Sequence, residues 1–349
     1  MNKYMSKKES NIIGTIRGIA MIFIVICHYL SWFPQFSVAG QIFNVGVPIF
    51  FIISGYLYGQ KNIGPSYKRW FCKQFRKIVL PLYIYYAIAG SLLLLLGKLG
   101  DINLISFCKL MLNLQGIAGG SAGNITTGHL WFITYILICY LITPALEQAK
   151  NAISWKKLFF LLSMLSILEI AMILTITPRA FLVNIQGVIL YIGAYYFAAL
   201  WKKKIKPVHY VTLSFVMIIA VGIRLGIKLL ADNSGGTWEV LYERVVVQYT
   251  QSILAVWIIF TIVLMGMMRK NCGSLFNIFS RYSYEIYIVH YMFLTGVFNA
   301  SKISDNLIVN TLIFVILAVS FAVVLHFLSS KITDKFFMRK RIAMEGEAQ

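Results

Sequence analysis

Long apolar stretches alternate with short polar loops along the whole chain. Ten of these stretches approach the length of about 20 residues that a helix needs to cross a hydrocarbon core. They occupy residues 12–33, 41–58, 78–96, 129–146, 158–177, 181–201, 210–230, 245–268, 284–299 and 307–330. The pattern predicts an all-α fold, a polytopic membrane helix bundle with about ten transmembrane helices.

The composition agrees with a membrane protein, because 59% of the residues are apolar and only 13% are charged. A net charge of +20 would suggest a nucleic-acid partner in a soluble protein, but here the basic residues lie between the apolar stretches. Three quarters of the Lys and Arg residues precede residue 12 or fall in the loops 61–77, 150–157, 202–206, 269–281 and 331–341. Such loops stay in the cytoplasm, beside anionic headgroups. We therefore expect both termini in the cytoplasm, contact with membrane lipids and no nucleic acid.

Residues 101–128 form a long segment between two apolar stretches and should lie outside the cell. The end of this segment, GIAGGSAGNITTG, is too rich in glycine for an ordinary spanning helix. A re-entrant or surface loop and a mobile external linker both fit this sequence. The position of the segment just before His129 favours contact with a functional site. The five cysteines show no paired spacing, so we expect neither disulfides nor a metal site.

Two ionisable residues, Arg17 and His28, lie in the first apolar stretch. Eleven residues correspond to three helical turns plus roughly 20°, so the two side chains share one face, about 16 Å apart along the axis. Ionisable groups at membrane depth usually face a bundle interior or a watery cavity. This face could connect a cytoplasmic donor with an external acceptor. Each residue alone also fits a structural role, with Arg17 reaching the inner headgroups and His28 hydrogen bonded to a neighbouring helix.

A cationic strip follows the second apolar stretch. Arg69, Lys73 and Arg76 stand at positions i, i+4 and i+7, which form one face of a helix. The preference for basic residues in cytoplasmic loops explains the positive charges of this segment, but not why three of them recur at helical spacing. Arginine forms bidentate bonds to phosphate oxygens, so the strip suits a nucleotide-bearing donor such as coenzyme A.

Other polar residues in the apolar stretches are weaker candidates. His129 is followed by Leu130 and Trp131, a sequence that an interfacial aromatic anchor largely explains. Tyr287 and His290 share a helix face at i, i+3, although spacing alone favours a structural histidine. Glu169 near the middle of a stretch should be neutral or paired with a basic group of another helix.

Taken together, these segments resemble acyltransferase family 3, whose integral membrane proteins carry an arginine and a histidine separated by ten residues in the first helix. That motif is RGIAMIFIVICH, from Arg17 to His28. The resemblance continues in family order through VGVPIFFIISGYL, RWFCKQFRKIVLP, HLWFI and SRYSYEIYIVH, which ends at His290. Each phrase is weak alone, but together they cover most of the chain.

The resemblance implies transfer of an acyl group, usually acetyl, from cytoplasmic acyl-CoA to a sugar hydroxyl of a surface glycan or lipid-linked glycan. Acetyl-CoA is then a donor substrate, and we expect no permanently bound cofactor. Residues 1–341 are expected to form a single transmembrane acyltransferase domain in the bacterial plasma membrane, followed by a short polar tail of residues 342–349. The resemblance also implies functional roles for Arg17 and His28.

The resulting hypothesis assigns donor phosphates to the cationic strip and makes His28 a general base or a transient acyl carrier, with Arg17 orienting the donor or stabilising negative charge. Ser54 is an alternative acyl carrier, but the SGY setting of Ser54 and Tyr56 favours helix packing. Tyr287 and His290 are expected to line the cavity. Transport of a small solute or glycolipid is the second interpretation, and a membrane scaffold or sensor is the third.

Overall fold

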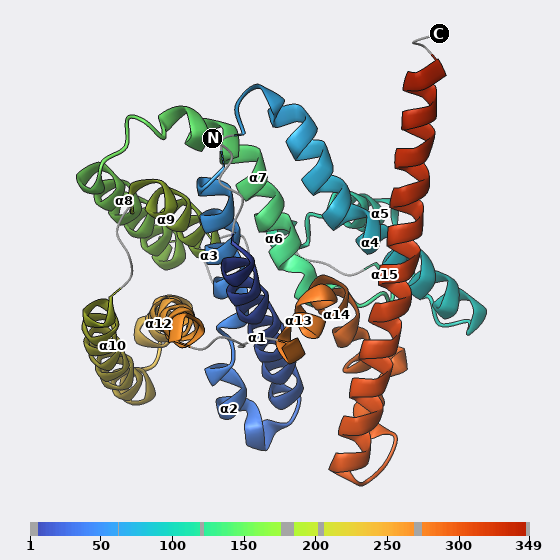
Figure 1. Ribbon diagram of the computed structural model, residues 1–349. Helices are drawn as coiled ribbons and strands as arrows, with labels where there is room; N and C mark the ends of the chain where they lie inside the picture. Colours follow the sequence, from blue (N-terminus) through green and yellow to red (C-terminus); the bar gives the residue numbers. More distant parts are fainter. Residues whose placement is uncertain are drawn as a thin grey trace. The chain divides into compact units, whose positions relative to one another are not determined.

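The computed structural model describes residues 6–61, 63–118, 122–175, 185–201, 206–268 and 274–346. This part of the chain is built from helices and contains no β-strand (Figure 1). The all-α prediction is therefore confirmed. Parts of two expected basic loops lie outside the described residues, namely 202–205 and 269–273, the second of which includes Cys272. Residues 176–184, around the expected start of one span, lie outside them as well.

Eight described segments are long and apolar enough to cross a membrane. Four of them are single helices: α1 (Lys7–Ser31), α4 (Tyr67–Leu95), α8 (Trp155–Thr175) and α10 (Pro207–Ser234). Three combine shorter elements: Pro34–Gly59 contains α2 (Ser37–Ile42) and α3 (Gly46–Gly59), Gly128–Ala149 contains α7 (Trp131–Ala149), and Thr237–Met267 contains α11 (Thr237–Leu241) and most of α12 (Val247–Met268). The last, Leu307–Asp334, is part of α15 (Leu307–Gly346). A shorter apolar helix, α9 (Gln186–Leu200), corresponds to another predicted span. These helices confirm a polytopic membrane bundle, whereas the count of ten and the cytoplasmic termini stay predictions.

The span expected at residues 284–299 differs from the prediction. The structure has α14 (Ser283–Val289) followed by three 3-10 segments, His290–Phe293, Gly296–Phe298 and Ala300–Lys302. Seven residues of α-helix rise only about 10 Å, against a hydrocarbon core of about 30 Å. Gly296 has φ +73°, a conformation that ends regular helix. Broken backbone at membrane depth is tolerated where protein buries it, and most residues from Ser283 to Leu294 are buried.

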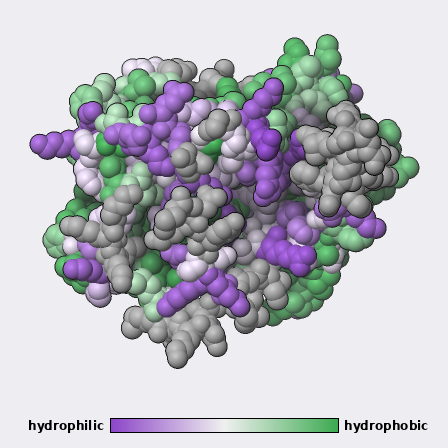
Figure 2. Space-filling model, turned by 45° about the horizontal axis from the view of Figure 1, so that its top comes forward, coloured by the Kyte–Doolittle hydropathy of each residue, from purple (hydrophilic) through white to green (hydrophobic). Residues whose placement is uncertain are grey.

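Contacts between residues divide the chain into two compact units. Unit 1 comprises Met1–Phe71, Asn113–Gly119 and Leu130–Arg281, and unit 2 comprises Cys72–Leu112, Gly120–His129 and Tyr282–Gln349. Large hydrophobic side chains are exposed on several helices, for example Val211, Phe215 and Ile218 on α10. Hydrophobic side chains also appear at the margins of the face drawn in Figure 2. Exposed apolar surface of this kind suits contact with lipid.

Glycines bring the helices of unit 1 close together. A Cβ added to Gly46 would collide with the Ala20 carbonyl of α1. Gly55 and Gly59, one turn apart on α3, lie against the backbone of α9 in the same way. Close approach through small residues is the usual packing device of membrane helices, because lipid supplies no hydrophobic drive between them.

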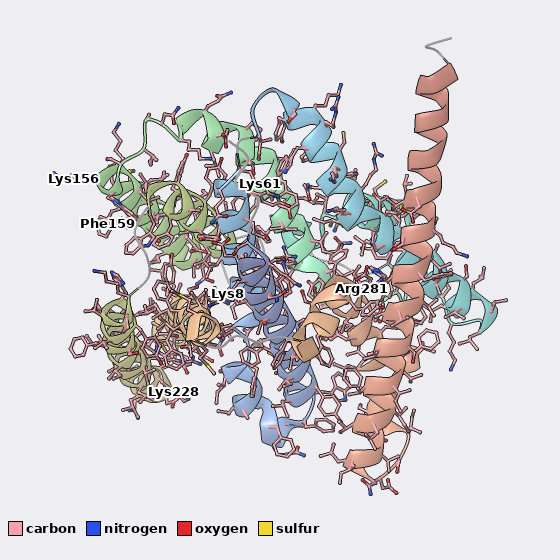
Figure 3. All side chains as sticks on the ribbon, viewed as in Figure 1. Lys8, Lys61, Lys156, Phe159, Lys228 and Arg281 are labelled. Atoms are coloured by element: carbon pink, nitrogen blue, oxygen red, sulfur yellow. The ribbon has the colours of Figure 1, made fainter. Side chains whose placement is uncertain are left out.

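Basic and aromatic residues gather where several helices of unit 1 end. The Lys150 ammonium donates to the Lys61 carbonyl oxygen at 2.9 Å, which joins the end of α7 to the end of α3. The Trp155 and Trp201 rings lie 6.3 Å apart, and Trp201 contacts His209 at 5.2 Å. Described parts of three predicted cytoplasmic loops therefore lie at one end of unit 1 (Figure 3). We call Lys61, Lys150, Lys156 and Lys206 the basic end of unit 1.

The glycine-rich segment before α7 is tied to its neighbours by hydrogen bonds. In unit 1, the Thr134 hydroxyl donates to the Asn113 carbonyl at 2.6 Å and accepts from the Gly116 amide at 3.0 Å, which fixes α6 (Gln115–Ala118) against α7. In unit 2, the Asn124 amide donates to the Leu99 carbonyl at 2.8 Å. Residues 119–121 lie outside the described residues. The described parts favour the re-entrant or surface loop over the mobile linker.

Polar contacts hold the last helices of unit 2 together. The Glu285 carboxylate on α14 lies 2.8 Å from His326 Nδ1 on α15. The Tyr284 hydroxyl donates to the Ile78 carbonyl of α4 at 2.6 Å. These bonds fix the short α14 between two long helices of the unit.

Candidate functional site

The α1 helix carries the two ionisable residues singled out by spacing. Its start is defined by a capping box, in which Ser6 and Glu9 satisfy each other's backbone amides. Arg17 lies ten residues after Lys7, about 15 Å along the axis, and His28 lies about 16 Å further on. Both side chains are half-buried, whereas Ile16, Ala20 and Ile24 face the core.

Arg17 lines a cavity of about 380 Å³ in unit 1. The lining residues come from three helices: Ser10, Asn11, Ile13, Gly14 and Arg17 from α1, Leu57 from α3, and Ser280 and Arg281 from α13 (Ser274–Arg281). Arg281 is the last residue of α13 (Figure 3). Gly18 allows α13 to approach, because a Cβ there would lie 2.5 Å from the Phe276 carbonyl oxygen. Two guanidinium groups therefore border one polar cavity.

A pair of tyrosines lies near Arg17. The Tyr58 and Tyr140 side chains are hydrogen bonded, with ring centroids 5.3 Å apart. Arg17 is close enough to interact electrostatically with both hydroxyls. Trp70, in the first turn of α4, packs on these rings with centroid distances of 5.0 and 5.6 Å. Trp70 thereby joins the start of α4 to the surroundings of Arg17.

The predicted cationic strip lies on α4, as expected from its helical spacing. Arg69, Lys73 and Arg76 are all exposed. The Tyr67 hydroxyl donates to the Tyr140 carbonyl at 3.0 Å, so the turn that carries Arg69 is fixed in unit 1. Lys73 and Arg76 belong to the part of α4 in unit 2.

Ser54 and Tyr56 are half-buried residues within α3. The glycine between them packs on the Tyr191 backbone of α9. Gly55 of the SGY sequence thus serves close packing at this point, and the role of Ser54 stays a prediction.

A histidine and tyrosine cluster forms in unit 2. His129 Nε2 lies 2.9 Å from the Ile288 carbonyl oxygen, and the Tyr287 hydroxyl donates to the His129 carbonyl. The His129 and His290 rings are 5.2 Å apart, and both residues are buried. His290 Nδ1 lies 2.9 Å from the Tyr287 carbonyl. Since carbonyl oxygens only accept, the ring nitrogens that face them carry the protons. The structure therefore brings His129 together with Tyr287 and His290, which lie on another segment of the chain.

Two further predicted positions have simple surroundings. Trp131 is half-buried at the start of α7 in unit 1, with its ring 6.2 Å from that of Tyr135. The buried Glu169 carboxylate accepts from the Gln186 amide at 2.7 Å and from the Tyr249 hydroxyl at 2.8 Å. It therefore lies at the N-terminus of α9, where the helix dipole favours a negative charge. Within the described part of the chain, the carboxylate contacts these hydrogen-bond donors rather than a basic side chain.

Sequence reasoning missed Arg281, Tyr58 and Tyr140 as neighbours of Arg17. Arg281 stands inside the quoted segment SRYSYEIYIVH, but nothing in its spacing links it to the first helix. In the described residues, no group of three His, Cys, Asp or Glu side chains is arranged to hold a metal ion.

A family model described as an acyltransferase domain matches residues 11–328, nearly the whole chain. No curated protein sequence matches the chain. No solved structure matches it either.

Proposed function

The chain belongs to the acyltransferase domain family, and from this premise we propose that it is a membrane O-acyltransferase. The proposed donor is cytoplasmic acyl-CoA, with acetyl-CoA first on the ground of the family resemblance. The proposed acceptor is a hydroxyl of an envelope, capsular or exopolysaccharide carbohydrate, presented as a surface or lipid-linked glycan at the bacterial plasma membrane.

The placement of Arg17 and His28 on α1 carries this proposal. Arg17 borders a cavity whose lining includes residues from the first turns of α1 and from the last turn of α3. His28 lies about 16 Å further along the same face. A single helix face thus leads from a polar cavity near the basic end of unit 1 toward the opposite end, as transfer from a cytoplasmic donor to an external acceptor requires.

The cationic strip supports the choice of donor. Arg69, Lys73 and Arg76 are exposed on one helix face and able to bind phosphate oxygens of coenzyme A. Trp70 anchors the turn of Arg69 beside the tyrosines that neighbour Arg17. Donor phosphates on the strip would leave the acyl-thioester arm free to reach into the bundle.

The reaction that we assign is a direct transfer. The neutral His28 imidazole takes the proton of the acceptor hydroxyl while the oxygen attacks the thioester carbonyl carbon. The carbon–sulfur bond then breaks, and the departing coenzyme A sulfur receives the proton from the imidazolium. The Arg17 guanidinium, about 16 Å from His28 along the axis of α1, orients the donor. An acyl-histidine at His28, or an acyl-serine at Ser54, would replace this single step by two.

We assign the remaining predicted residues to the acceptor side of the site and to positioning the helices around it. Tyr287 and His290 hold the shape of the cluster in unit 2 around His129, and Trp131 begins the helix that follows it. Ser54 and Tyr56 flank a glycine contact in α3. We assign none of these residues a proton-transfer role in the direct mechanism.

The test is acyl transfer by the purified protein in lipid, with radiolabelled acetyl-CoA and envelope glycans. Wild-type protein should label the glycan and release free coenzyme A, and His28→Ala should reduce both by at least 100-fold, within the range of general base catalysis. His209→Ala is the matched control, because His209 lies at the start of α10 and hydrogen bonds only locally among the described contacts. Equal labelling by wild type and His28→Ala would refute the assignment of His28.

Transport is the second candidate, favoured by the broken helix at α14. Discontinuous helices are typical of substrate sites in secondary transporters. Absence of wild-type turnover with a panel of acyl donors and verified acceptors would place transport first.

A further inference from the structure

We infer that the cavity beside Arg17 binds the diphosphate group of the acyl-CoA donor and that Arg281 supplies its second guanidinium. This inference rests on the proposed function and extends it to a residue that the sequence motifs did not single out. Every residue that carries the argument belongs to unit 1.

The chemistry of the lining suits an anion. Arg17 and Arg281 are accompanied by Ser10, Asn11 and Ser280, which supply hydroxyl and amide donors. Among the described residues that line the cavity, none carries a carboxylate. Glu9, the acidic residue nearest in sequence, is engaged in the capping box with Ser6. A volume of about 380 Å³ falls in the range of small-molecule sites, and so leaves room for a phosphate-bearing group.

Two guanidinium groups around one cavity favour a doubly charged ligand. Arginine stays protonated in proteins, so neither side chain relieves the repulsion by losing its proton. An anion between the two groups removes that repulsion and receives bidentate hydrogen bonds from both. A diphosphate presents oxygens on two phosphorus atoms, and each guanidinium can therefore bind one phosphate.

The backbone around the cavity is built to bring the two arginines together. Gly14 lines the cavity without a side chain that would fill it. Gly18, one residue after Arg17, allows the α13 backbone to touch α1 at Phe276. Arg281 follows Phe276 by five residues in the same short helix. The approach of α13 to α1 thus determines where the second guanidinium lies.

The location of the cavity separates its role from that of the cationic strip. Coenzyme A carries phosphate at two places, a 3′-phosphate on the ribose and a diphosphate that leads into the pantetheine arm. The strip is exposed on the surface of α4, whereas Arg17 lies about 15 Å along α1, on the way to His28. The diphosphate is the group nearer the reacting thioester, so it belongs in the cavity, and the 3′-phosphate is left to Arg69, the residue of the strip that belongs to unit 1.

The test compares three donors that share the acetyl-pantetheine arm and differ in the groups attached to it. Acetyl-CoA carries both groups, acetyl-3′-dephospho-CoA lacks the 3′-phosphate, and acetyl-pantetheine lacks the diphosphate and the nucleotide. Arg281→Gln should raise KM about 10- to 100-fold for the first two donors, as expected for lost charged hydrogen bonds, and leave KM for acetyl-pantetheine unchanged. Arg281→Lys should recover part of the loss. Lys156→Gln, an exposed cation at the basic end of unit 1, is the control for general surface charge.

Binding of ADP gives a readout that does not depend on turnover. ADP carries a diphosphate but no acyl arm, so calorimetry should show binding to wild type, at least tenfold weaker binding to Arg281→Gln, and unchanged binding to Lys156→Gln. Equal KM increases for acetyl-pantetheine and acetyl-CoA would show that Arg281 acts through the fold and overturn the inference. Arg281-independent ADP binding would overturn it as well. If wild type turns over no acyl donor yet binds ADP through Arg281, the proposed function fails and the anion site stands.

Discussion

Replacing Gly18 with alanine should push α13 away from α1 at the cavity beside Arg17. The added Cβ would lie 2.5 Å from the Phe276 carbonyl oxygen, whereas ordinary contacts begin at 3.4 Å. The two backbones must therefore separate by roughly 0.9 Å, the difference between these two distances. Because the obstacle is backbone rather than a flexible side chain, no rotamer change relieves the contact. Overpacking of this kind costs about 1–3 kcal/mol of unfolding free energy.

The same displacement should reduce activity, because it moves Arg281 relative to Arg17. A misplacement of about 1 Å can lower a rate by roughly 100-fold. We expect Gly18→Ala to lower kcat/KM for acetyl-CoA between about 10- and 100-fold, mainly through KM. Steady-state kinetics in lipid and thermal unfolding in detergent measure the two effects separately.

Gly222→Ala provides the matched control for this substitution. Gly222 lies in α10, and no atom would come within 4 Å of an added Cβ. Alanine should therefore leave kcat/KM unchanged and stabilise the helix by up to about 1 kcal/mol. Wild-type stability and wild-type kcat/KM in Gly18→Ala would refute the contact between α1 and α13 on which the cavity depends.

Two further substitutions test the packing around the site. Gly59→Ala should lower the unfolding free energy by about 1–3 kcal/mol, because the added Cβ would collide with the Tyr195 carbonyl of α9. Thermal unfolding measures this loss, and an unchanged melting temperature would contradict the close packing of α3 on α9. Thr134→Val removes the hydroxyl that bonds the Asn113 carbonyl and the Gly116 amide, which should lower the unfolding free energy by about 1–3 kcal/mol. Amide hydrogen exchange at Gly116 should become faster, and exchange as slow as in wild type would contradict the role of these two hydrogen bonds.

The membrane fold could be predicted from the sequence because each spanning helix shows its own apolar length. The shared face of Arg17 and His28 followed from helical geometry alone. The cationic strip was predictable for the same reason, since Arg69, Lys73 and Arg76 lie on one continuous helix. Predictions that depend on a single helix thus needed no knowledge of its neighbours.

The break after α14 could not be predicted from hydropathy. The apolar pattern of residues 284–299 predicted a spanning helix, yet the helix ends at Val289 and the His290 Nδ1 atom bonds two carbonyl oxygens of the preceding turn. Gly296 then takes a left-handed conformation. Hydropathy reports whether a segment is buried but not whether lipid or protein covers it, and only protein permits such a break.

The surroundings of Arg17 were hidden from the sequence because they come from four distant segments. Leu57, Tyr140 and Arg281 are separated from Arg17 by tens to hundreds of positions, and no periodicity connects them. Their meeting depends on contacts such as those of Gly18 with α13 and of Gly46 with α1, whose role appears only when the partner backbone is known. A glycine in an apolar helix is by itself a common residue.

The histidines of unit 2 need a different experimental treatment from His28. His129 and His290 are buried, and each directs a ring nitrogen at backbone carbonyl oxygens, so that nitrogen holds its proton and the ring orientation is fixed. Removing either ring would leave these carbonyls without their partner and create a cavity, which together destabilise the cluster. A loss of activity in His290→Ala therefore bears on catalysis only if the variant keeps wild-type stability, whereas the half-buried His28 can be judged from turnover and stability measured side by side.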